Sequence, residues 1–304
     1  MTAALATDRL TKQFDTSMAV DAVDWEVSEG SICALVGANG AGKSTLLKML
    51  IGLIWPTGGK VEILGHPLGR EAAEIRQRVH YVSGDAAPTP SFRVPDLVRY
   101  ASLVYERFDR ARFRRLQQVL ELPLQRPVRT LSTGQKAQIS LAIALSSRPD
   151  LMILDEPTNG LDPVVKRQFL QLMVQEAASE GTTVVLATHQ LDDVERIADA
   201  IAVMYRGRMV ASGNIDALRG DLHRFQAALP HGLPPALADH PQVLRVDRQG
   251  VVFTITAQGD VEEFAKGLHR AGAAFVEEID LELSDWFRWI MDKEGYRRDG
   301  LLFS

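Results

Sequence analysis

The chain has 304 residues, and its shares of hydrophobic residues (46%) and charged residues (24%) are those of an ordinary globular protein. A formal net charge of -5 excludes a general attraction to nucleic acid, so we expect no nucleic-acid partner. Cys33 is the only cysteine, which excludes an internal disulfide. From the amino terminus onward, the sequence shows neither a signal-peptide pattern nor a window near the roughly 18 apolar residues of a membrane span, so we expect a soluble, cytoplasmic protein.

The first segment with clear chemical content is a glycine-rich loop. Residues 32–36 (ICALV) form a continuous apolar run, which is typical of a strand buried on both faces. The spacing GxxxxGK[ST] follows, and apolar residues at helical spacing come after it. Strand, loop and helix are the context of a phosphate-binding loop, whose backbone N–H groups and lysine bind phosphates. We expect nucleotide binding by Gly37, Ala38, Asn39, Gly40, Ala41, Gly42, Lys43, Ser44 and Thr45.

A helical region is predicted next. Residues 91–108 (SFRVPDLVRYASLVYERF) carry apolar side chains at helical spacing, and Pro95 suits the first turn of a helix. Arginines here alternate with apolar residues: Arg107, Arg110, Arg112, Arg114 and Arg115. We interpret these arginines as a solvated helix face, because the acidic total of the chain argues against a nucleic-acid surface.

A further helix is predicted to begin near Thr130, in the run TLSTGQKAQISLAIAL. Ser132 and Gln135 have the spacing of a capping box, which gives the helix a defined start. A helix start presents unpaired N–H groups and the positive end of the helix dipole, and both suit an anion. We therefore expect an anion to bind at Ser132, Thr133, Gly134 and Gln135.

A pair of carboxylates follows a second apolar run, residues 151–154 (LMIL). Asp155 stands at the end of this predicted strand, where it can share a Mg²⁺ ion with Ser44 of the phosphate loop. Glu156 can polarise a water that is aimed at the terminal phosphate. The alternative is a pair of surface acids that only caps the strand, and Pro157 weakens it by ending the strand in a turn.

A histidine follows the third apolar run, residues 184–187 (VVLA). A lone histidine is more often structural than catalytic. At the end of a parallel strand, however, His189 faces the crevice in which such sheets bind ligands, and there it can hydrogen-bond the terminal phosphate. We therefore expect Lys43, Glu156 and His189 to be catalytic.

In this order the motifs resemble those of the ATP-binding subunits of ATP-binding-cassette (ABC) transporters, over residues 10–214. GANGAGKST, LDEP, NGLD and TH match family motifs, and TLSTGQ is similar to the LSGGQ signature, with Thr133 at the first glycine. The resemblance implies an α/β P-loop NTPase cassette with a mixed sheet, a helical signature subdomain over residues 84–148, and ATP and Mg²⁺ as cofactors. Phe14 matches the aromatic residue that stacks on adenine, and Trp55 is a rival by chemistry only.

The resemblance also implies an assembly. In the family the signature acts on ATP held by a partner subunit, so Lys43 and Asp155 of one chain would work with Ser132 and Gly134 of another. The partner would be a second copy or a paralogous ATPase subunit. Both would dock on an integral-membrane permease, which implies a place at the inner face of the cell membrane.

One segment departs from the family pattern. VHYVSGDAAPTP aligns with the loop that normally reads YLPQ, whose glutamine contacts Mg²⁺ and the attacking water. Gly84 takes the glutamine position, between Ser83 and Asp85. Either Asp85 supplies the missing oxygen, as a further catalytic residue, or the coupling between nucleotide and partner is altered. Asp85 serves equally well as a turn cap before Pro88.

The pattern changes near residue 217, where we place the boundary between an ATP-binding domain (1–217) and a small α+β domain (218–304). The expected elements are a proline-rich linker (229–241), a hairpin around Gln249-Gly250, a helix (260–271), a strand (274–283) and a last helix capped by Ser284. This domain resembles the tails of exporter-type cassette subunits. We expect the aromatic residues of the last helix to pack on the domain's own sheet, with contact to a permease as the alternative.

Together these residues predict an ABC-type ATPase that powers a membrane permease, specifically an exporter, by ATP-driven closure of a dimer. Two alternatives are a soluble ABC-type ATPase of translation or DNA repair, and a P-loop kinase or GTPase. The first would show a second cassette or a long coiled coil, and the sequence contains neither a repeat nor heptads. The second leaves TLSTGQ and TH unexplained.

Overall fold

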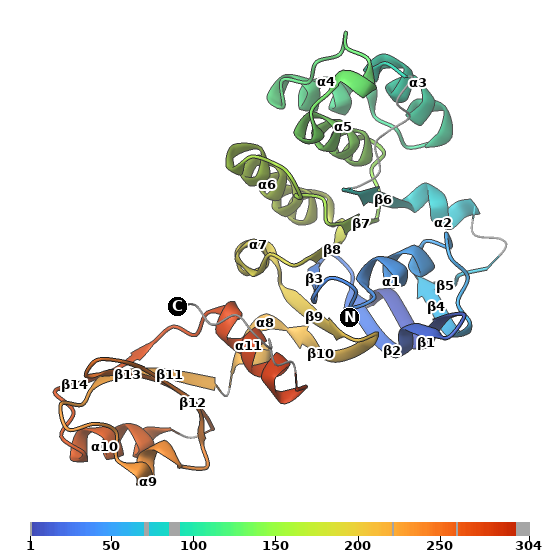
Figure 1. Ribbon diagram of the computed structural model, residues 1–304. Coiled ribbons are helices and arrows are strands. Elements are labelled where there is room, and N and C mark those ends of the chain that lie inside the picture. Colours follow the sequence, from blue (N-terminus) through green and yellow to red (C-terminus); the bar gives the residue numbers. More distant parts are fainter. Residues whose placement is uncertain (1, 70–72, 85–91, 221, 260, 296–304) are drawn as a thin grey trace. The chain divides into compact units, whose positions relative to one another are not determined.

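The chain forms two compact units, Met1–Gly213 and Asn214–Ser304 (Figure 1). The computed structural model describes residues 2–69, 73–84, 92–220, 222–259 and 261–295. The division comes four residues before the expected domain boundary at 217, which falls inside helix α8 (Ile215–Arg219). Each unit has a hydrophobic core of its own.

A six-stranded sheet organises the first unit. It consists of β3 (Ile32–Val36), β6 (Val79–Ser83), β7 (Leu151–Asp155), β8 (Thr183–Thr188), β9 (Ala200–Tyr205) and β10 (Arg208–Asn214). The order is β10-β9-β3-β8-β7-β6, and the strands from β9 to β6 run parallel to their neighbours. Only two residues separate β9 from its neighbour β10, so β10 runs antiparallel and the sheet is mixed, as predicted. Every residue of β3, β7 and β8 is buried, as their apolar runs predict.

A smaller antiparallel sheet shares a core with one face of the six-stranded sheet. Its strands, in the order β2-β1-β4-β5, are β1 (Ala3–Phe14), β2 (Ser17–Ser28), β4 (Gly58–Ile63) and β5 (His66–Pro67). Helix α1 (Lys43–Leu50) contributes its apolar face to the same core. The six-stranded sheet contributes alternate residues of its strands, such as Cys33 and Leu35 of β3 and Ile153 of β7.

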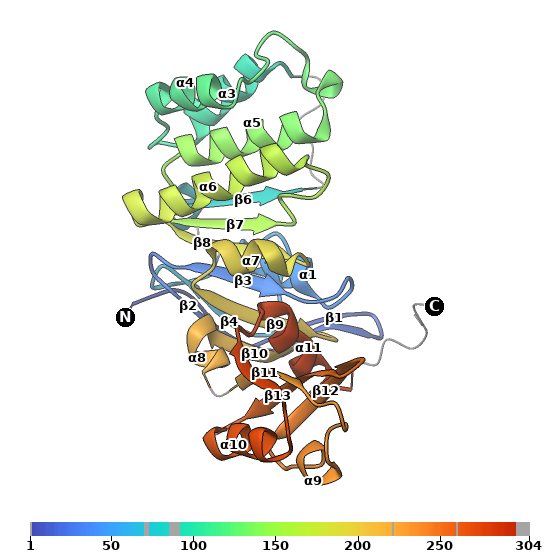
Figure 2. The ribbon, with the colours of Figure 1, turned by 90° about the vertical axis from the view of Figure 1, so that its left-hand side faces the viewer.

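Helices cover the opposite face of the six-stranded sheet. They are α3 (Val94–Val104), α4 (Arg110–Val119), the 3-10 helix η1 (Val128–Thr130), α5 (Thr133–Ser146), α6 (Pro163–Glu180) and α7 (Leu191–Ile197). Helix α2 (Ala73–Arg78) instead contributes Ile75 to the core on the side of α1. A second core contains residues of α3, α4, α5 and α6 together with sheet residues such as Met152 and Leu154. Figures 1 and 2 show α3, α4 and α5 grouped at one end of the unit. Pro95 lies in the first turn of α3, as predicted.

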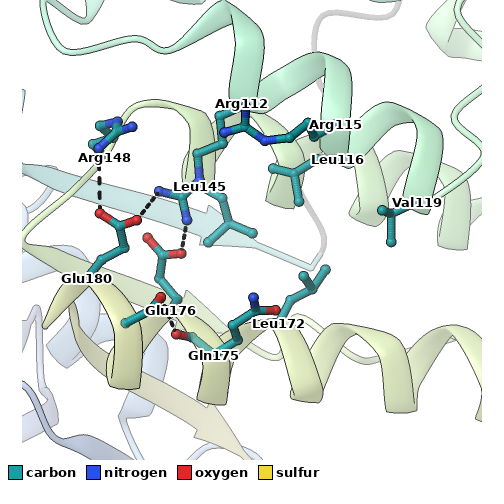
Figure 3. A pocket seen from close by; sticks show the side chains of 11 residues that line it. Arg112, Arg115, Leu116, Val119, Leu145, Arg148, Leu172, Gln175, Glu176 and Glu180 are labelled. Atoms are coloured by element: carbon teal, nitrogen blue, oxygen red, sulfur yellow. Dashed lines mark hydrogen bonds and ion pairs between the residues drawn. The ribbon is translucent and has the colours of Figure 1, made fainter.

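Ion pairs connect this helical group to α6. Arg112 of α4 pairs with Glu176 and, at 3.3 Å, with Glu180, both on α6 (Figure 3). Arg148 pairs with Glu180 at 3.6 Å and with Asp109, the N-cap of α4, at 2.8 Å. Arg112 and Glu176 are largely buried, so removal of Arg112 would leave the Glu176 carboxylate buried without its counter-charge. The pairs therefore fix α4 and α5 against α6.

The second unit contains a four-stranded antiparallel sheet with the order β12-β13-β11-β14. Beyond α8 its elements are β11 (Leu222–Ala228), α9 (Pro235–Ala238), β12 (Val243–Gln249), β13 (Val252–Gln258), α10 (Glu262–Arg270), β14 (Phe275–Ile279) and α11 (Leu283–Lys293). From β11 to β14 this is the ferredoxin-like βαββαβ arrangement. Phe225, Ile255 and Phe264 lie in its core.

Most of the elements predicted for this unit are confirmed. The hairpin turns at Gly250, α10 ends before Gly272, and β14 follows. The cap of the last helix was predicted wrongly: α11 has Glu282 as its N-cap, and the Ser284 hydroxyl donates to the Glu282 carboxylate at 3.2 Å instead. The proline-rich segment contains α9, and β11 had no predicted counterpart. Trp286 of α11 is buried.

A buried histidine lies where β6 meets the ends of α3 and α5. His80 Nδ1 lies 3.0 Å from the Ser147 hydroxyl oxygen, and the imidazole stacks on Tyr105 with 4.9 Å between ring centroids. Burial lowers the pKa of His80 from 6.5 to about 4. The folded chain therefore holds this imidazole neutral at pH values where the unfolded chain protonates it.

We expect acid to destabilise the protein through His80. The unfolded chain binds a proton below about pH 6.5 and the folded chain only near pH 4, so the free energy of unfolding should fall across this interval, by on the order of 3 kcal/mol at its end. His80→Phe keeps the stack on Tyr105 and should flatten this dependence in urea unfolding measured over the same pH range. His66→Phe, on the exposed strand β5, is the control. Identical slopes for parent and His80→Phe would contradict the prediction.

Candidate active site

Three neighbouring strands end at one edge of the six-stranded sheet. β3, β8 and β7 are adjacent and parallel, so the phosphate loop, Glu156 and His189 follow strands whose carboxyl ends meet. Lys43 Nζ lies 3.7 Å from Glu156 Oε1, and His189 Nδ1 lies 3.0 Å from Glu156 Oε2. The structure thus brings three of the four predicted catalytic side chains into contact.

Two glycines determine the course of the phosphate loop. Gly42 has a φ of +106°, and a Cβ there would lie 2.3 Å from the backbone oxygen of Ala19. At Gly37 a Cβ would lie 2.4 Å from the backbone oxygen of Met204. A larger residue fits neither position unless the backbone moves. The other loop residues range from exposed to buried: Asn39 and Gly40 are exposed, Ala38 and Thr45 partly exposed, and Ala41 buried.

Lys43 begins α1, and its ammonium points back into the loop. Nζ donates to the backbone oxygens of Gly37 at 2.7 Å and Ala38 at 3.4 Å, and the side chain is only 6% exposed. The first turn of α1, which starts at Lys43, contains no acidic residue, and its N-cap Gly42 has no side chain to cap the N–H groups. The unpaired N–H groups of the helix start and the nearby ammonium therefore suit phosphate oxygens.

Asp155 accepts a hydrogen bond at each carboxylate oxygen. Ser44 Oγ donates to Oδ1 and the Tyr81 hydroxyl donates to Oδ2, both at 3.0 Å. The oxygens of Ser44 and Asp155 are hard ligands at a separation that fits one shared Mg²⁺ together with substrate phosphates. Sequence reasoning missed Tyr81, which pairs with Ile153 two residues before Asp155 and so lies on the face that carries α1. The only signal in the sequence was that Tyr81 lies two residues before Ser83, the end of β6, and therefore on the same face of the sheet as Ser83.

Glu156 leaves β7 in a strained turn. Its φ is +49°, in the left-handed region that residues other than glycine rarely adopt. Its N–H donates to the Ala187 oxygen of β8 at 2.9 Å, and its own carbonyl accepts from Asn159 at 3.2 Å. This turn directs the carboxylate to Lys43 and His189. Glu156 is 18% exposed and His189 is 46% exposed, so the pair is accessible from solvent.

Gly84, which the resemblance aligns with the family's glutamine, lies directly against this turn. Its N–H donates to the Asp155 oxygen at 2.8 Å, and a Cβ there would lie 2.2 Å from the Glu156 carbonyl oxygen. The turn that holds Glu156 therefore requires glycine at this position, and a glutamine does not fit this backbone. Asp85 lies outside the described residues, so its role stays a prediction.

Helix α5 starts with the predicted capping box. Ser132 Oγ accepts from the Gln135 N–H, and Gln135 Oε1 accepts from the Ser132 N–H, both at 3.1 Å. Gly134 lies beside Leu161, which follows β7, and a Cβ on Gly134 would make an ordinary contact of 3.6 Å there. Among the described residues, none comes close enough to require glycine at 134, and its expected role at a partner subunit stays a prediction.

The two aromatic candidates for adenine stacking lie on either side of one lysine. Phe14 ends β1 and is 44% exposed, and Trp55 is 58% exposed. Lys12 Nζ lies 4.9 Å from the centre of the Phe14 ring and donates to the Trp55 carbonyl at 2.8 Å. Phe14 is therefore accessible, with the Lys12 ammonium over its ring, and its stacking on adenine stays a prediction.

A parallel sheet with a glycine-shaped phosphate loop, a serine–aspartate pair and a glutamate at the next strand end defines a P-loop nucleotide hydrolase. Comparison with known proteins identifies the family. Residues 20–159 match the ABC transporter family. The chain is 35% identical to the daunorubicin/doxorubicin resistance ATP-binding protein DrrA of Streptomyces peucetius, over 73% of this chain and 68% of DrrA. It therefore belongs to the ATP-binding proteins of ABC transporters, which are ATP-hydrolysing subunits.

Further similarities extend over both units and to a known assembly. The ABC transporter ATP-binding protein YtrB of Bacillus subtilis (strain 168) is 28% identical, over 92% of this chain and 95% of YtrB. The solved dimeric bacterial ABC transporter cassette MJ0796 is 25% identical, with a TM-score of 0.63, over 69% of this chain and 98% of that chain. Family membership removes the kinase and GTPase alternative. Within the described ranges, no helix combines the length and apolar character needed to cross a membrane.

We predict that Tyr81→Phe raises the Mg²⁺ concentration needed for half-maximal ATP hydrolysis by about tenfold, because Asp155 loses one of the hydrogen bonds that orient it. The measurement is the Mg²⁺ concentration at half-maximal turnover under saturating ATP. Nucleotide affinity without Mg²⁺ should stay at the parental value. Tyr100→Phe removes an exposed hydroxyl of α3 and serves as the control. A Tyr81→Phe protein with the parental Mg²⁺ curve would show that this bond is dispensable.

We predict that Gly84→Gln does not restore the family's glutamine function. The new Cβ would meet the Glu156 carbonyl, so the free energy of unfolding should fall by about 1–3 kcal/mol and turnover should not rise. Gly84→Ala should lose a similar amount, because it carries the same Cβ. Gly69→Gln is the control, since a Cβ at Gly69 meets no atom within 4 Å. Higher turnover in stable Gly84→Gln protein would refute the steric argument.

Proposed function

We propose that the chain powers a membrane exporter as one of two cassette subunits that close around two ATP molecules. One observation carries the proposal. Lys43, Glu156 and His189 meet at one end of the parallel sheet, beside the Ser44–Asp155 pair. The capped start of α5 borders Leu161 and has no structural need for glycine at 134. A dimeric cassette with the same fold supports the two-chain assembly.

ATP would bind through contacts that the chain already prepares. The ammonium of Lys43 would leave the carbonyls of Gly37 and Ala38 and bind the terminal phosphates. Ser44 and Asp155 would hold Mg²⁺, which when bound neutralises charge on the phosphate oxygens. Tyr81 would keep Asp155 oriented, although it touches no phosphate itself. Phe14 would stack on the adenine.

Hydrolysis would proceed through Glu156. Its carboxylate accepts a proton from a water while the water oxygen forms a bond to the γ-phosphorus. The bond from that phosphorus to the bridging oxygen breaks, and ADP leaves with the electron pair. His189 holds Glu156 at 3.0 Å and, exposed as it is, reaches the γ-phosphate that occupies the loop. The positive end of a partner's α5, at its Ser132 and Gly134, would bind the same phosphate.

The assembly would include a permease. ABC ATPases dimerise and work with membrane permeases, and this chain would therefore lie at the inner face of the cell membrane. The export direction rests on the similarity to the resistance protein DrrA. The second cassette is either another copy or a paralogous subunit, because one chain carries one complete set of motifs.

We predict that Glu156→Gln retains ATP affinity but loses at least about a hundredfold in turnover, because the amide cannot accept the proton. ATP should then trap a stable dimer in light scattering. Glu29→Gln, an exposed acid in the turn before β3, is the control and should turn over as the parent does.

Lys43→Ala should affect nucleotide binding, whereas Glu156→Gln should affect only turnover. The Lys43→Ala variant should bind ATP more weakly and form no dimer, because it lacks the charge that spans two phosphates. A Glu156→Gln protein that stays monomeric at saturating ATP would contradict the two-chain site. Parental nucleotide affinity in Lys43→Ala would contradict the assignment of the phosphate loop.

A further inference from the structure

The helical group α3–α4 carries a charge opposite to that of the whole chain. Residues 92–130 contain nine arginines and four acids, a net charge of +5 in a chain whose total is -5. Arg107 and Arg112 are engaged by carboxylates. Among the residues that the structure describes, seven other exposed arginines form no ion pair between their guanidinium group and a carboxylate: Arg93, Arg99, Arg110, Arg114, Arg115, Arg126 and Arg129.

Two pockets flank α4, and their charges differ. The pocket between α4 and α6 has a volume of about 310 Å³, and Figure 3 shows Arg112 and Arg148 turned toward acids. Arg112 and Arg148 there face Glu176 and Glu180. Two of its three arginines are thus paired with acids, so it offers less to an outside anion than a pocket that contains no acid.

The pocket between α3 and α4 lacks such compensation. Its volume is about 370 Å³, and in the described part of the chain none of its lining residues is acidic. Val98, Phe113 and Leu124 form its apolar floor, and Arg99, Arg110 and Arg114 stand around them. The Arg110 guanidinium donates to the Ser102 hydroxyl at 2.8 Å, which leaves its other N–H groups for an anion.

The surface of α3 beside this pocket is unusually apolar for an exposed helix. Tyr100 is 59% exposed and Leu103 is 76% exposed. Arginines next to exposed aromatic and aliphatic side chains suit a membrane interface, where phosphates and glycerol esters lie together. An anion without an apolar part would bind the arginines and leave the apolar floor of the pocket exposed to water.

We propose that the α3–α4 surface, meaning the pocket with Arg99, Arg110 and Arg114 together with Tyr100 and Leu103, binds anionic phospholipid headgroups at the membrane surface. The inference rests on the proposed function, because a permease partner brings the chain to the membrane. The arginines bind the lipid phosphates, and the apolar floor receives the glycerol region of one lipid. This contact holds the helical group against the bilayer beside the permease.

Vesicle binding of the full chain tests the proposal. The chain should sediment with vesicles of phosphatidylcholine mixed with phosphatidylglycerol, but not with phosphatidylcholine alone, and added salt should release it. Each arginine near an anionic surface is worth about a fivefold change in binding, so Arg99→Gln/Arg114→Gln should bind on the order of 25-fold more weakly. Both side chains are exposed, so the variant should fold.

A charge-matched variant separates this surface from charge in general. Lys60→Gln/Arg196→Gln removes two exposed cations elsewhere in the same unit and should bind vesicles as the parent does. An equal loss in both double variants overturns the proposal, as does parental binding by Arg99→Gln/Arg114→Gln. Suppose that Arg99→Gln/Arg114→Gln binds vesicles as the parent does but no longer co-purifies with its permease in detergent. That result also overturns the proposal, in favour of an acidic protein partner.

ATP hydrolysis by the same preparations keeps the two proposals distinguishable. A parent that hydrolyses ATP but ignores anionic vesicles removes the lipid surface and leaves the proposed function intact. A parent without ATP hydrolysis removes the proposed function, whatever the vesicles show. The double arginine variant should retain the parental ATPase rate in the absence of vesicles, because neither arginine touches the nucleotide site.

Discussion

The active site depends on how the end of β7 is held between its two neighbours. The Asp155 carbonyl accepts the Gly84 N–H from the β6 side, and the Glu156 N–H donates to Ala187 on the β8 side. These bonds hold Glu156 in a left-handed turn that costs about 1–3 kcal/mol in isolation. The cost is offset by the buried parallel sheet, and the position of the carboxylate beside Lys43 follows from the turn. Without this arrangement the phosphate loop would still face Asp155, but it would lose the carboxylate of Glu156.

Gly84 shows how a bare backbone shapes this turn. It lets β6 approach the carbonyl of Glu156 so closely that a Cβ at this position would clash with it. The result is a tightly packed turn at Glu156. Tyr81, on the same strand, keeps β6 in contact with the site through Asp155. In this chain β6 therefore acts on the nucleotide site through positioning.

The sequence was sufficient for features that local pattern decides. Continuous apolar runs identified the buried strands, and parallel strand ends explained why Glu156 and His189 meet. Pairing between distant segments was out of reach: Tyr81 contacts Asp155 only because of the β6–β7 register, and the strand order of the second unit depends on similar pairings. Ser284 marks a local limit, because a helix start can shift by two residues when neighbouring positions offer competing polar groups.

Helix α5 has a mechanical consequence for the proposed dimer. Its 14 residues span about 21 Å, from the capped start at Ser132 to Ser147 at its other end. Ser147 touches His80 of β6, and β6 ends at Gly84, against Glu156. A packed helix cannot shorten, so in the proposed dimer a tilt imposed on its first turn by a neighbour's nucleotide would pass along the rigid helix into the strand that supports Glu156 of this chain. Two such chains would then couple their two nucleotide sites mechanically.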